Sequence, residues 1–170
     1  MNPDELRGAL ERLHDQSFAW ALSCCAYDHE QARDVLQTSY LKAISGAARY
    51  EERATVKTWL FAVIRNTAAS ARRSRLVRQR LLALWRGEPQ VAVGHGPEDG
   101  ADASTGAVRA ALARLSPRQR EVLHLVFYQD MTIQAASEVM GVRLGTARQH
   151  YERGKRALRR QLEEREAAYA

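Results

Sequence analysis

Positively charged and aromatic side chains are concentrated in one uninterrupted stretch, VKTWLFAVIRNTAASARRSRLVRQRLLALWR, which runs from Val56 to Arg86. It contains one lysine and seven arginines but no acidic residue. Three aromatic residues are interspersed among these cations: Trp59, Phe61 and Trp85. Arginine and lysine bind phosphates, and arginine and asparagine also pair with base edges, so the stretch has the chemistry of a nucleic-acid-binding surface. A solvated basic face would have the same composition, and the stretch alone does not decide between the two.

The same stretch is expected to be helical because neither glycine nor proline interrupts it. On a helical wheel, one side of 59–75 is suited to burial: Leu60, Val63, Ile64, Thr67 and Ala71. The opposite side is expected to face outward: Thr58, Arg65, Asn66, Ala69, Arg72 and Arg73. The rest of the chain must therefore supply helices that cover the first side.

Composition sets the fold class and the kind of partner. The length of 170 residues and a hydrophobic content of 45% predict one domain or two small ones. Alanine, leucine, arginine and glutamate dominate, so we expect an all-α fold. The net charge of +6 and a pI of about 9.7 favour a polyanionic partner such as nucleic acid. The first 52 residues instead hold nine acids and five bases, which indicates a different partner for this part.

Several function classes find no support. No nucleotide-binding loop, metal-ligand cluster or nucleophile–histidine–acid grouping is visible, so we expect neither an enzyme nor a bound cofactor or metal. No apolar run reaches the roughly 20 residues of a membrane span. The N-terminus has acids where a signal peptide would be basic and apolar, so we expect a cytoplasmic protein. The adjacent Cys24 and Cys25 leave two interpretations open, small buried thiols or a metal site with His14 or His29.

Two helices, 5–26 and 31–48, are predicted before the basic stretch, with Asp28 as N-cap of the second. The inner face of 31–48 is expected to consist of Ala32, Val35, Leu36, Tyr40, Ala43 and Ile44. The opposite side holds Asp34, Gln37, Thr38, Leu41 and Lys42. Leu41 is the apolar exception there, and it is either an ordinary exposed leucine or the centre of a protein-binding patch with a polar rim.

A loop and a linker flank the basic stretch. Thr55, at the end of the loop 49–55, is expected to cap the helix that follows. Tyr50 in this loop either stacks on an unpaired base or packs on the core. The segment 87–106 holds five of the ten glycines and is expected to be a flexible linker, which divides the chain into domains 1–86 and 107–170.

The second domain has the pattern of a helix-turn-helix. A capped helix is predicted at 116–129, with a core of Val122, Leu123, Leu125, Val126 and Phe127. Thr132 can cap a short helix that Gly141 ends in a left-handed turn, and a long polar helix follows. An amphipathic helix in a plain bundle would show the same periodicity.

The long helix has distinct inner and outer faces. The inner face is expected to be Ala147, Tyr151, Gly154, Leu158 and Leu162. The outer face near the N-terminus, which would meet a major groove, is Thr146, Arg148, Gln149, Glu152 and Arg153. The cations that follow either clamp phosphates or solvate the helix end: Lys155, Arg156, Arg159 and Arg160.

Taken together, these segments resemble a bacterial RNA polymerase sigma factor of the sigma-70 family, and more closely its short extracytoplasmic-function (ECF, group IV) type. QARDVLQTSYLKAI is similar to the family's region 2.2, and RYEERATVKTWLFAVIRNTAASARR to regions 2.3 and 2.4. LSPRQREVLHLVFYQDMTIQAASEVMGVRLGTARQHYERGKRALRRQL is similar to region 4. The order and spacing of the three stretches around a linker make the resemblance specific.

The resemblance implies two small helical domains, sigma regions 2 and 4, and a role for each surface. The polymerase-binding patch, on the clamp coiled coil of the largest subunit, would be Asp34, Gln37, Thr38, Leu41 and Lys42. The −10 element of the promoter would be bound and melted by Tyr50, Lys57, Trp59, Arg65, Asn66, Arg72 and Arg73. The −35 element would be read by Thr146, Arg148, Gln149, Glu152, Arg153 and Lys155. The polymerase beta subunit and an anti-sigma factor, which can hold such a protein at the membrane, are further implied partners.

The chain departs from the family's pattern at positions that bear on these roles. Thr38 replaces an acid and Ile44 a tryptophan in region 2.2, which would retune docking on the polymerase. Ser137 and Arg143 replace the usual alanine and serine of region 4. Gln149 and His150 replace serine and arginine where bases are read, so a −35 sequence cannot be taken over from relatives. The alternative function is a helix-turn-helix regulator that acts without core polymerase.

Overall fold

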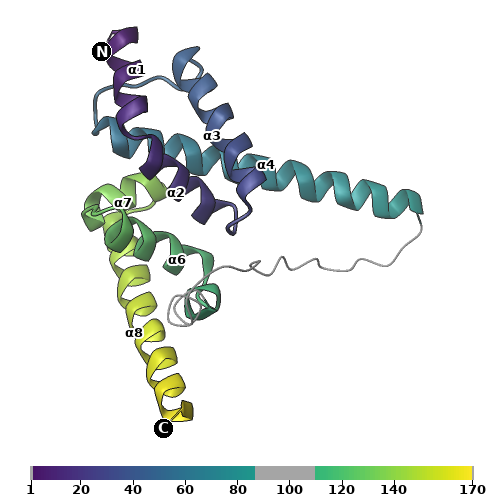
Figure 1. The fold of residues 1–170 in the computed structure, drawn as a ribbon, viewed down its shortest axis with the longest axis vertical. Coiled ribbons are helices and arrows are strands. Elements are labelled where there is room, and N and C mark those ends of the chain that lie inside the picture. Colours follow the sequence, from purple (N-terminus) through teal and green to yellow (C-terminus); the bar gives the residue numbers. More distant parts are fainter. Residues whose placement is uncertain (1, 87–109, 170) are drawn as a thin grey trace. The chain divides into compact units, whose positions relative to one another are not determined.

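The computed structural model describes residues 2–86 and 110–169, and every regular element in these two ranges is helical (Figure 1). The described residues fall into two compact units, one within Met1–Pro97 and one within Glu98–Ala170. The helices of the first unit are α1 (Pro3–Arg12), α2 (His14–Cys24), α3 (His29–Ile44) and α4 (Val56–Arg86). Those of the second are α6 (Pro117–Leu123), the π-helical turn η1 (His124–Tyr128), α7 (Ile133–Met140) and α8 (Leu144–Tyr169). The predicted all-α fold is confirmed, and the linker predicted at 87–106 lies outside the described residues.

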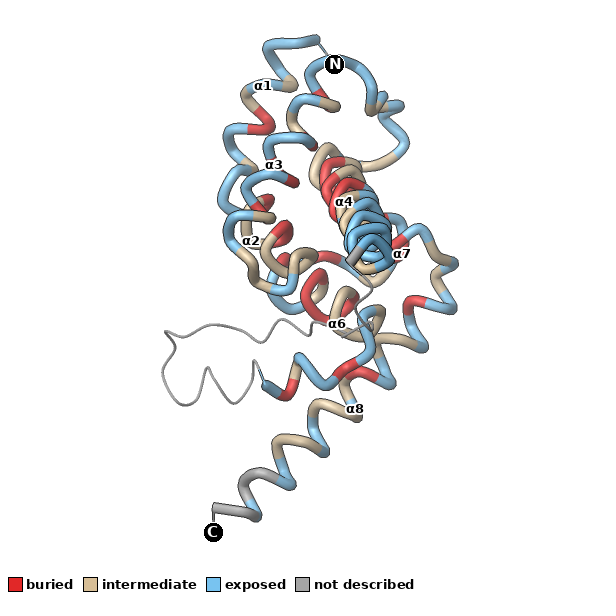
Figure 2. The backbone as a smooth tube through the Cα atoms, turned by 90° about the vertical axis from the view of Figure 1, so that its right-hand side faces the viewer, coloured by how far each residue is buried: buried red, intermediate tan, exposed pale blue. Residues whose placement is uncertain are grey.

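The core of the first unit is the apolar face of α4 packed against α2 and α3. Leu60, Phe61 and Ile64 of α4 are completely buried, as is Trp20 of α2. The Trp20 indole Nε1 donates a hydrogen bond of 3.0 Å to the Phe61 carbonyl oxygen, and the two rings stack with centroids 6.0 Å apart. Figure 2 shows the consequence along α4, whose N-terminal half is buried on one side while its C-terminal part is exposed.

Side-chain caps start the helices where the sequence indicates. The Asp28 carboxylate accepts from the Gln31 amide at 2.9 Å, and the Thr55 hydroxyl accepts from the Thr58 amide at 3.1 Å. Both predicted N-caps are therefore confirmed, since each satisfies one of the free amides of a first turn. In the second unit, Ser116 forms a capping box with Gln119, as predicted.

Two predicted helix ranges were wrong. The helix expected at 5–26 is two helices, α1 and α2, because the backbone leaves the helical conformation at Leu13 (φ −93°, ψ 2°). Hydrogen bonds still run through Leu13, from its amide to Ala9 and from the Ser17 amide to its carbonyl, so the interruption is a bend. The helix expected at 31–48 ends at Ile44, since Gly46 adopts a left-handed φ of +75°.

Three residues were assigned to the wrong side of their helices. Thr58 is buried rather than outward-facing, because its hydroxyl lies 2.9 Å from that of Thr55 inside the first turn of α4. Ile44 is 58% exposed because it occupies the last turn of α3, where Ala43 takes the inward position. Phe127 is 57% exposed because it lies in η1. The wider π turn shifts the residues after His124 around the axis relative to an α-helix, and Gln129 becomes buried instead.

The second unit packs α6 and α7 against α8. Thr132 caps α7 through the Ala135 amide at 3.1 Å, and Gly141 ends it with a left-handed φ of +63°, so the predicted cap and turn are confirmed. At Gly154 of α8, an added Cβ would lie 3.1 Å from Leu123 Cδ1 and 3.2 Å from Gln119 Cβ. Because both atoms belong to α6, a Cβ at this position would require Leu123 or Gln119 to shift by a few tenths of an ångström, so glycine favours the close approach of α6 and α8.

We expect Gly154→Leu to lower the free energy of unfolding of the second unit by about 1–3 kcal/mol, since the side chain overpacks the α6–α8 contact. Gly145→Leu is the matched control, because nothing lies within 4 Å of a Cβ at Gly145. All three tryptophans lie in the first unit. The urea unfolding curve measured by tryptophan emission, which reports only the first unit, should therefore stay unchanged. Far-UV circular dichroism, which also reports the second unit, should show its loss of stability. Equal stability of both variants would contradict close packing at Gly154.

A buried histidine makes the second unit sensitive to acid. The His124 ring stacks on Tyr128, with centroids 5.3 Å apart and planes 8° from parallel, and burial lowers its pKa from 6.5 to about 4. Between these values the unfolded chain binds the proton and the folded chain does not, so stability present above pH 6.5 is lost as the pH falls toward 4. We expect a loss of about 2–4 kcal/mol in this window, measured by urea unfolding at stepped pH. His124→Phe retains the stacked ring and should remove this part of the pH dependence; an unchanged profile would contradict the assignment.

Candidate nucleic-acid and protein interfaces

The outward side of α3 carries an apolar centre within a polar rim. Leu41 is 62% exposed, and Ile44, one turn further on, is 58% exposed. The predicted neighbours Asp34, Gln37 and Thr38 are exposed around them. Sequence reasoning assigned Ile44 to the core, although its spacing of three residues from Leu41 could have placed both on one face. The two side chains together form a larger apolar surface than the lone leucine expected.

Lys42 differs from the other residues of this patch. It is only partly exposed, and its ammonium Nζ donates a hydrogen bond of 3.1 Å to the Thr67 hydroxyl of α4. A groove of about 250 Å³ lies beside it between α3 and α4. Lys42 therefore connects the two helices at the edge of the patch, and it presents less charge to a partner than the sequence predicts.

The front of α4 is a continuous cationic surface. Asn66, Arg72 and Arg73 are exposed, and Arg65 is partly buried, on the side opposite the buried Leu60 and Ile64. The residues from 66 to 73 span about 10 Å along the helix axis, which is the length of roughly three base pairs. No acid of α4 can neutralise these cations, because the helix contains none.

The loop before α4 is held against the helix by an aromatic pair. The Tyr50 and Trp59 rings lie with centroids 5.2 Å apart and tilted by 50°. The Tyr50 hydroxyl donates to the Ala54 carbonyl at 2.7 Å, and the Trp59 indole donates to the Arg49 carbonyl at 3.1 Å. Tyr50 is thus partly buried against Trp59, and these contacts hold its loop against the start of α4. Lys57 lies alongside, with its Nζ 5.5 Å from the centre of the Phe61 ring.

The first turns of α8 present the predicted base-reading face. Thr146, Arg148, Gln149, Glu152 and Arg153 are all exposed, whereas Ala147 and Gly154 are buried on the other side. Lys155 is partly exposed and is held at the edge of this face, with its Nζ 3.8 Å from a Glu152 carboxylate oxygen and 5.1 Å from the centre of the Tyr151 ring.

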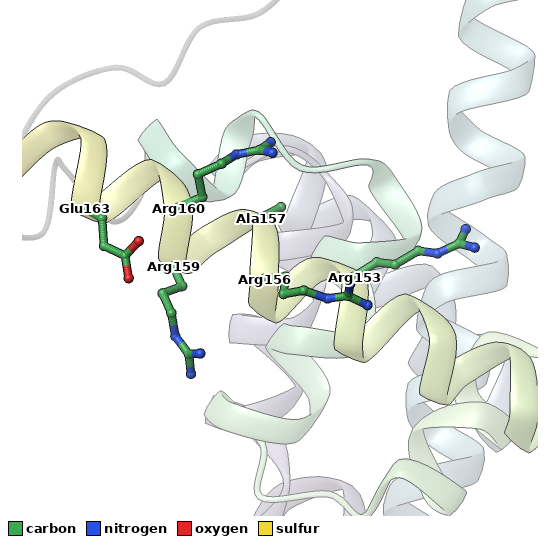
Figure 3. A pocket seen from close by; sticks show the side chains of 6 residues that line it. All are labelled: Arg153, Arg156, Ala157, Arg159, Arg160 and Glu163. Carbon is green, nitrogen blue, oxygen red and sulfur yellow. The ribbon is translucent and has the colours of Figure 1, made fainter.

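The same outward side of α8 stays cationic for two more turns. Arg153, Arg156, Arg159 and Arg160 line an open hollow of about 480 Å³ together with Ala157 and Glu163 (Figure 3). The Arg160 guanidinium Nε lies 3.8 Å from a Glu164 carboxylate oxygen. These arginines extend the polar face of the helix beyond the residues that would reach bases.

The cysteines offer less chemistry than the sequence left open. Cys24 and Cys25 are not joined in a disulfide bond, and burial raises the pKa of Cys25 to about 11, which keeps its thiol protonated. Within 2–86 and 110–169, no group of three or more histidine, cysteine, aspartate or glutamate side chains is placed to hold a metal ion. None of the helices in these ranges is long and apolar enough to cross a membrane.

Comparison with known proteins identifies the family. Residues 9–78 match the family description "Sigma-70 region 2", and residues 105–158 match "Sigma-70, region 4". The chain therefore belongs to the sigma-70 family. It is an ECF sigma factor, a non-enzymatic subunit that directs RNA polymerase to promoters.

Relatives of this type align over most of the chain. The ECF sigma factor SigX of Bacillus subtilis is 26% identical over 148 residues, which cover 80% of this chain and 73% of SigX. The ECF sigma factor SigC of Mycobacterium tuberculosis is 29% identical over 148 residues, covering 84% and 76%.

Two solved structures share the fold. The sigma factor RpoE of Bartonella quintana, in complex with the anti-sigma factor NepR, has a TM-score of 0.73 at 24% identity, over 94% of this chain and 97% of that one. CnrH, in complex with the cytosolic domain of CnrY, has a TM-score of 0.63 at 18% identity, over 95% and 90% of the two chains.

Proposed function

We propose that this sigma factor docks on the clamp coiled coil of the polymerase largest subunit through the outward side of α3. The observation that carries this assignment is the pair Leu41 and Ile44, which are exposed side by side within a polar rim. Exposed apolar groups surrounded by polar residues are typical of protein-binding surfaces. Asp34, Gln37 and Thr38 form the rim, and Lys42 positions α3 on α4.

We further propose that domain 1–86 binds and melts the −10 element. Asn66, Arg72 and Arg73 contact DNA along the front of α4, with Lys57 and Arg65 at its edge. The pair Tyr50–Trp59 receives a base flipped from the duplex and stacks on it. Because the loop is already held against α4, binding the base loses little further conformational entropy of the loop.

Domain 107–170 reads the −35 element with Thr146, Arg148, Gln149, Glu152, Arg153 and Lys155. Arginine and glutamine are suited to guanine and adenine respectively. The beta subunit of polymerase is its second protein contact, and the linker 87–106 joins the two DNA-bound domains.

An anti-sigma factor is the proposed regulatory partner. It would cover the polymerase-binding surfaces in the cytoplasm and could hold the sigma factor at the membrane. Support comes from RpoE, which has the same fold and was solved in complex with the anti-sigma factor NepR. CnrH, which also has this fold, was solved in complex with the cytosolic domain of CnrY.

Transcription in vitro from a genomic fragment library tests the whole assignment. Core polymerase with this protein should give transcript starts that core alone does not, and the upstream sequences should share two elements. Intact core binding without new starts would contradict promoter reading. Tight duplex binding without core would instead favour a plain helix-turn-helix regulator.

We expect Leu41→Asp and Ile44→Asp each to weaken binding to core polymerase at least 30-fold, because a charge would replace a buried apolar contact worth about 2 kcal/mol or more. Ala113→Asp makes the same charge change at an exposed residue of the second unit and should bind normally. Fluorescence anisotropy of labelled protein with core measures affinity, and circular dichroism verifies folding. Normal core binding by both α3 variants would exclude this patch as the docking site.

Trp59→Phe tests the melting loop. It retains an aromatic ring beside Tyr50 but removes the hydrogen bond to the Arg49 carbonyl. We expect open-complex formation to slow about fivefold, in proportion to one hydrogen bond of about 1 kcal/mol. Initiation from a promoter melted beforehand should be normal. Trp85→Phe, at the far end of α4, is the control, and an equal defect on melted and duplex templates would argue against a role in melting.

A further inference from the structure

The last three turns of α4 expose an unusual amount of apolar surface. Ten large hydrophobic residues are exposed in the part of the chain that the structure describes, and six of them lie between residues 76 and 85. Trp85 is 89% exposed and Leu84 76%. In Figure 1 this end of α4 extends past α1, α2 and α3, and its beginning, at Leu76 and Gln79, still lines a pocket with Cys24 at the end of α2. Neither the −10 contacts nor the α3 patch explains these side chains.

The most exposed of these residues form a stripe. Val77, Leu81, Leu84 and Trp85 follow the spacing i, i+4, i+7 and i+8, which places them within an arc of about 100° on a helix. Their exposed fractions range from 54% to 89%. We call these four residues the α4 stripe. Its width is that of the seam along which two helices pack.

Cations border the stripe on both edges. Arg73 and Arg80 lie along one edge and Arg78 along the other, and all three are exposed. No acid is present in α4 to pair with them. In paired helices, charged residues at these flanking positions select a partner of opposite charge.

Other occupants fit this pattern less well. A second copy of the chain would bring arginine against arginine along the seam. Duplex DNA would bind the arginines but leave the leucines without a partner. A membrane surface favours cations on the face opposite the apolar one; α4 has Arg72 and Arg75 on that face, but three further arginines lie directly along the edges of the stripe.

We propose that the α4 stripe is a second protein-docking surface and that it binds an acidic amphipathic helix of a partner protein. Apolar side chains of that helix pack on Leu81 and Leu84, and its flanking carboxylates pair with Arg78 and Arg80. The stripe is separate from the α3 patch, so this proposal does not rest on the polymerase and promoter contacts assigned above. A helix end without tertiary contacts is marginally stable in water, so the partner also stabilises the helical conformation of residues 80–86.

The probe is a synthetic 21-residue peptide with leucines at the seam positions of each heptad and glutamates beside them, compared with a scrambled peptide of equal composition. Full-length protein should bind the patterned peptide one to one. Trp85 emission should shift to the blue, a shift that Trp85→Phe removes, and amide exchange should slow across 76–86.

Variants separate the apolar from the charged contribution. We expect Leu81→Gln with Leu84→Gln to weaken peptide binding at least 10-fold. Arg78→Gln with Arg80→Gln should weaken it about 3-fold to 10-fold at low salt and remove most of its salt dependence. Leu41→Gln with Ile44→Gln is the matched control and should bind the peptide normally while losing core polymerase.

Three results would overturn the proposal. The scrambled peptide could bind as well as the patterned one, which would reduce the stripe to a nonspecific basic surface. Phosphatidylglycerol vesicles could bind through Leu81 and Leu84 where the peptide does not, which would make it a lipid site. Sedimentation could show self-association that the double leucine variant abolishes, which would make the occupant a second copy.

Discussion

The burial of one face of α4 is the constraint on which the first unit depends. Trp20 lies at its centre, with its ring on Phe61 and its indole nitrogen bonded to the Phe61 carbonyl. A rotation of α4 by one residue, about 100°, would turn arginines of the front toward the core, and burying an unpaired charge costs several kcal/mol. Apolar packing on the buried face of α4 therefore determines the direction in which the proposed DNA-binding side points. The Lys42–Thr67 hydrogen bond adds a polar contact that holds α3, and with it the proposed polymerase patch, in a defined register on α4.

In the second unit, close backbone packing determines which side of α8 faces outward. Gly154 lets α8 approach Leu123 and Gln119 of α6, and this contact fixes which side of α8 faces outward. Gln149 and Arg153 are exposed as a consequence of what is buried behind them. The π turn η1 instead exposes apolar side chains, since it brings the aromatic rings of Phe127 and Tyr128 to the surface after the end of α6.

Local chemistry made much of this structure predictable. Asp28, Thr55 and Thr132 cap helices through their own side chains, and Gly141 needs only its freedom at positive φ. Such features depend on a few neighbouring residues. The wrong predictions concern side chains whose exposure depends on residues distant in the sequence or on several elements together. Nothing near Phe127 indicates a π turn, and the exposure of Ile44 depends on where α3 stops covering α4.

The candidate surfaces were predictable to the same degree. Periodicity places Asn66 or Gln149 on an outward face, because the opposite face is visibly apolar. It does not show that Tyr50 packs on Trp59, that Lys42 bonds to Thr67, or that Lys155 lies against Tyr151. Whether these contacts form depends on how the helices and loops pack against one another, or on which rotamer a long side chain adopts. The sequence periodicity therefore predicts which side chains are exposed, but it does not predict the contacts that restrict each of them.

Along its 31 residues α4 carries three surfaces in succession: the aromatic pair at its start, the cationic front in its middle and the stripe at its end. The helix has no glycine or proline, so these surfaces keep a fixed order over about 46 Å. Arg73 lies at the boundary, since it belongs to the front that would contact DNA and also lies one turn before Val77, the first residue of the stripe. A protein helix seated on the stripe would draw this guanidinium into an ion pair and bring carboxylates next to the DNA path. Occupation of the stripe would therefore oppose binding of promoter DNA through electrostatics, because the continuity of one helix places the proposed protein-docking surface directly beside the proposed promoter-binding surface.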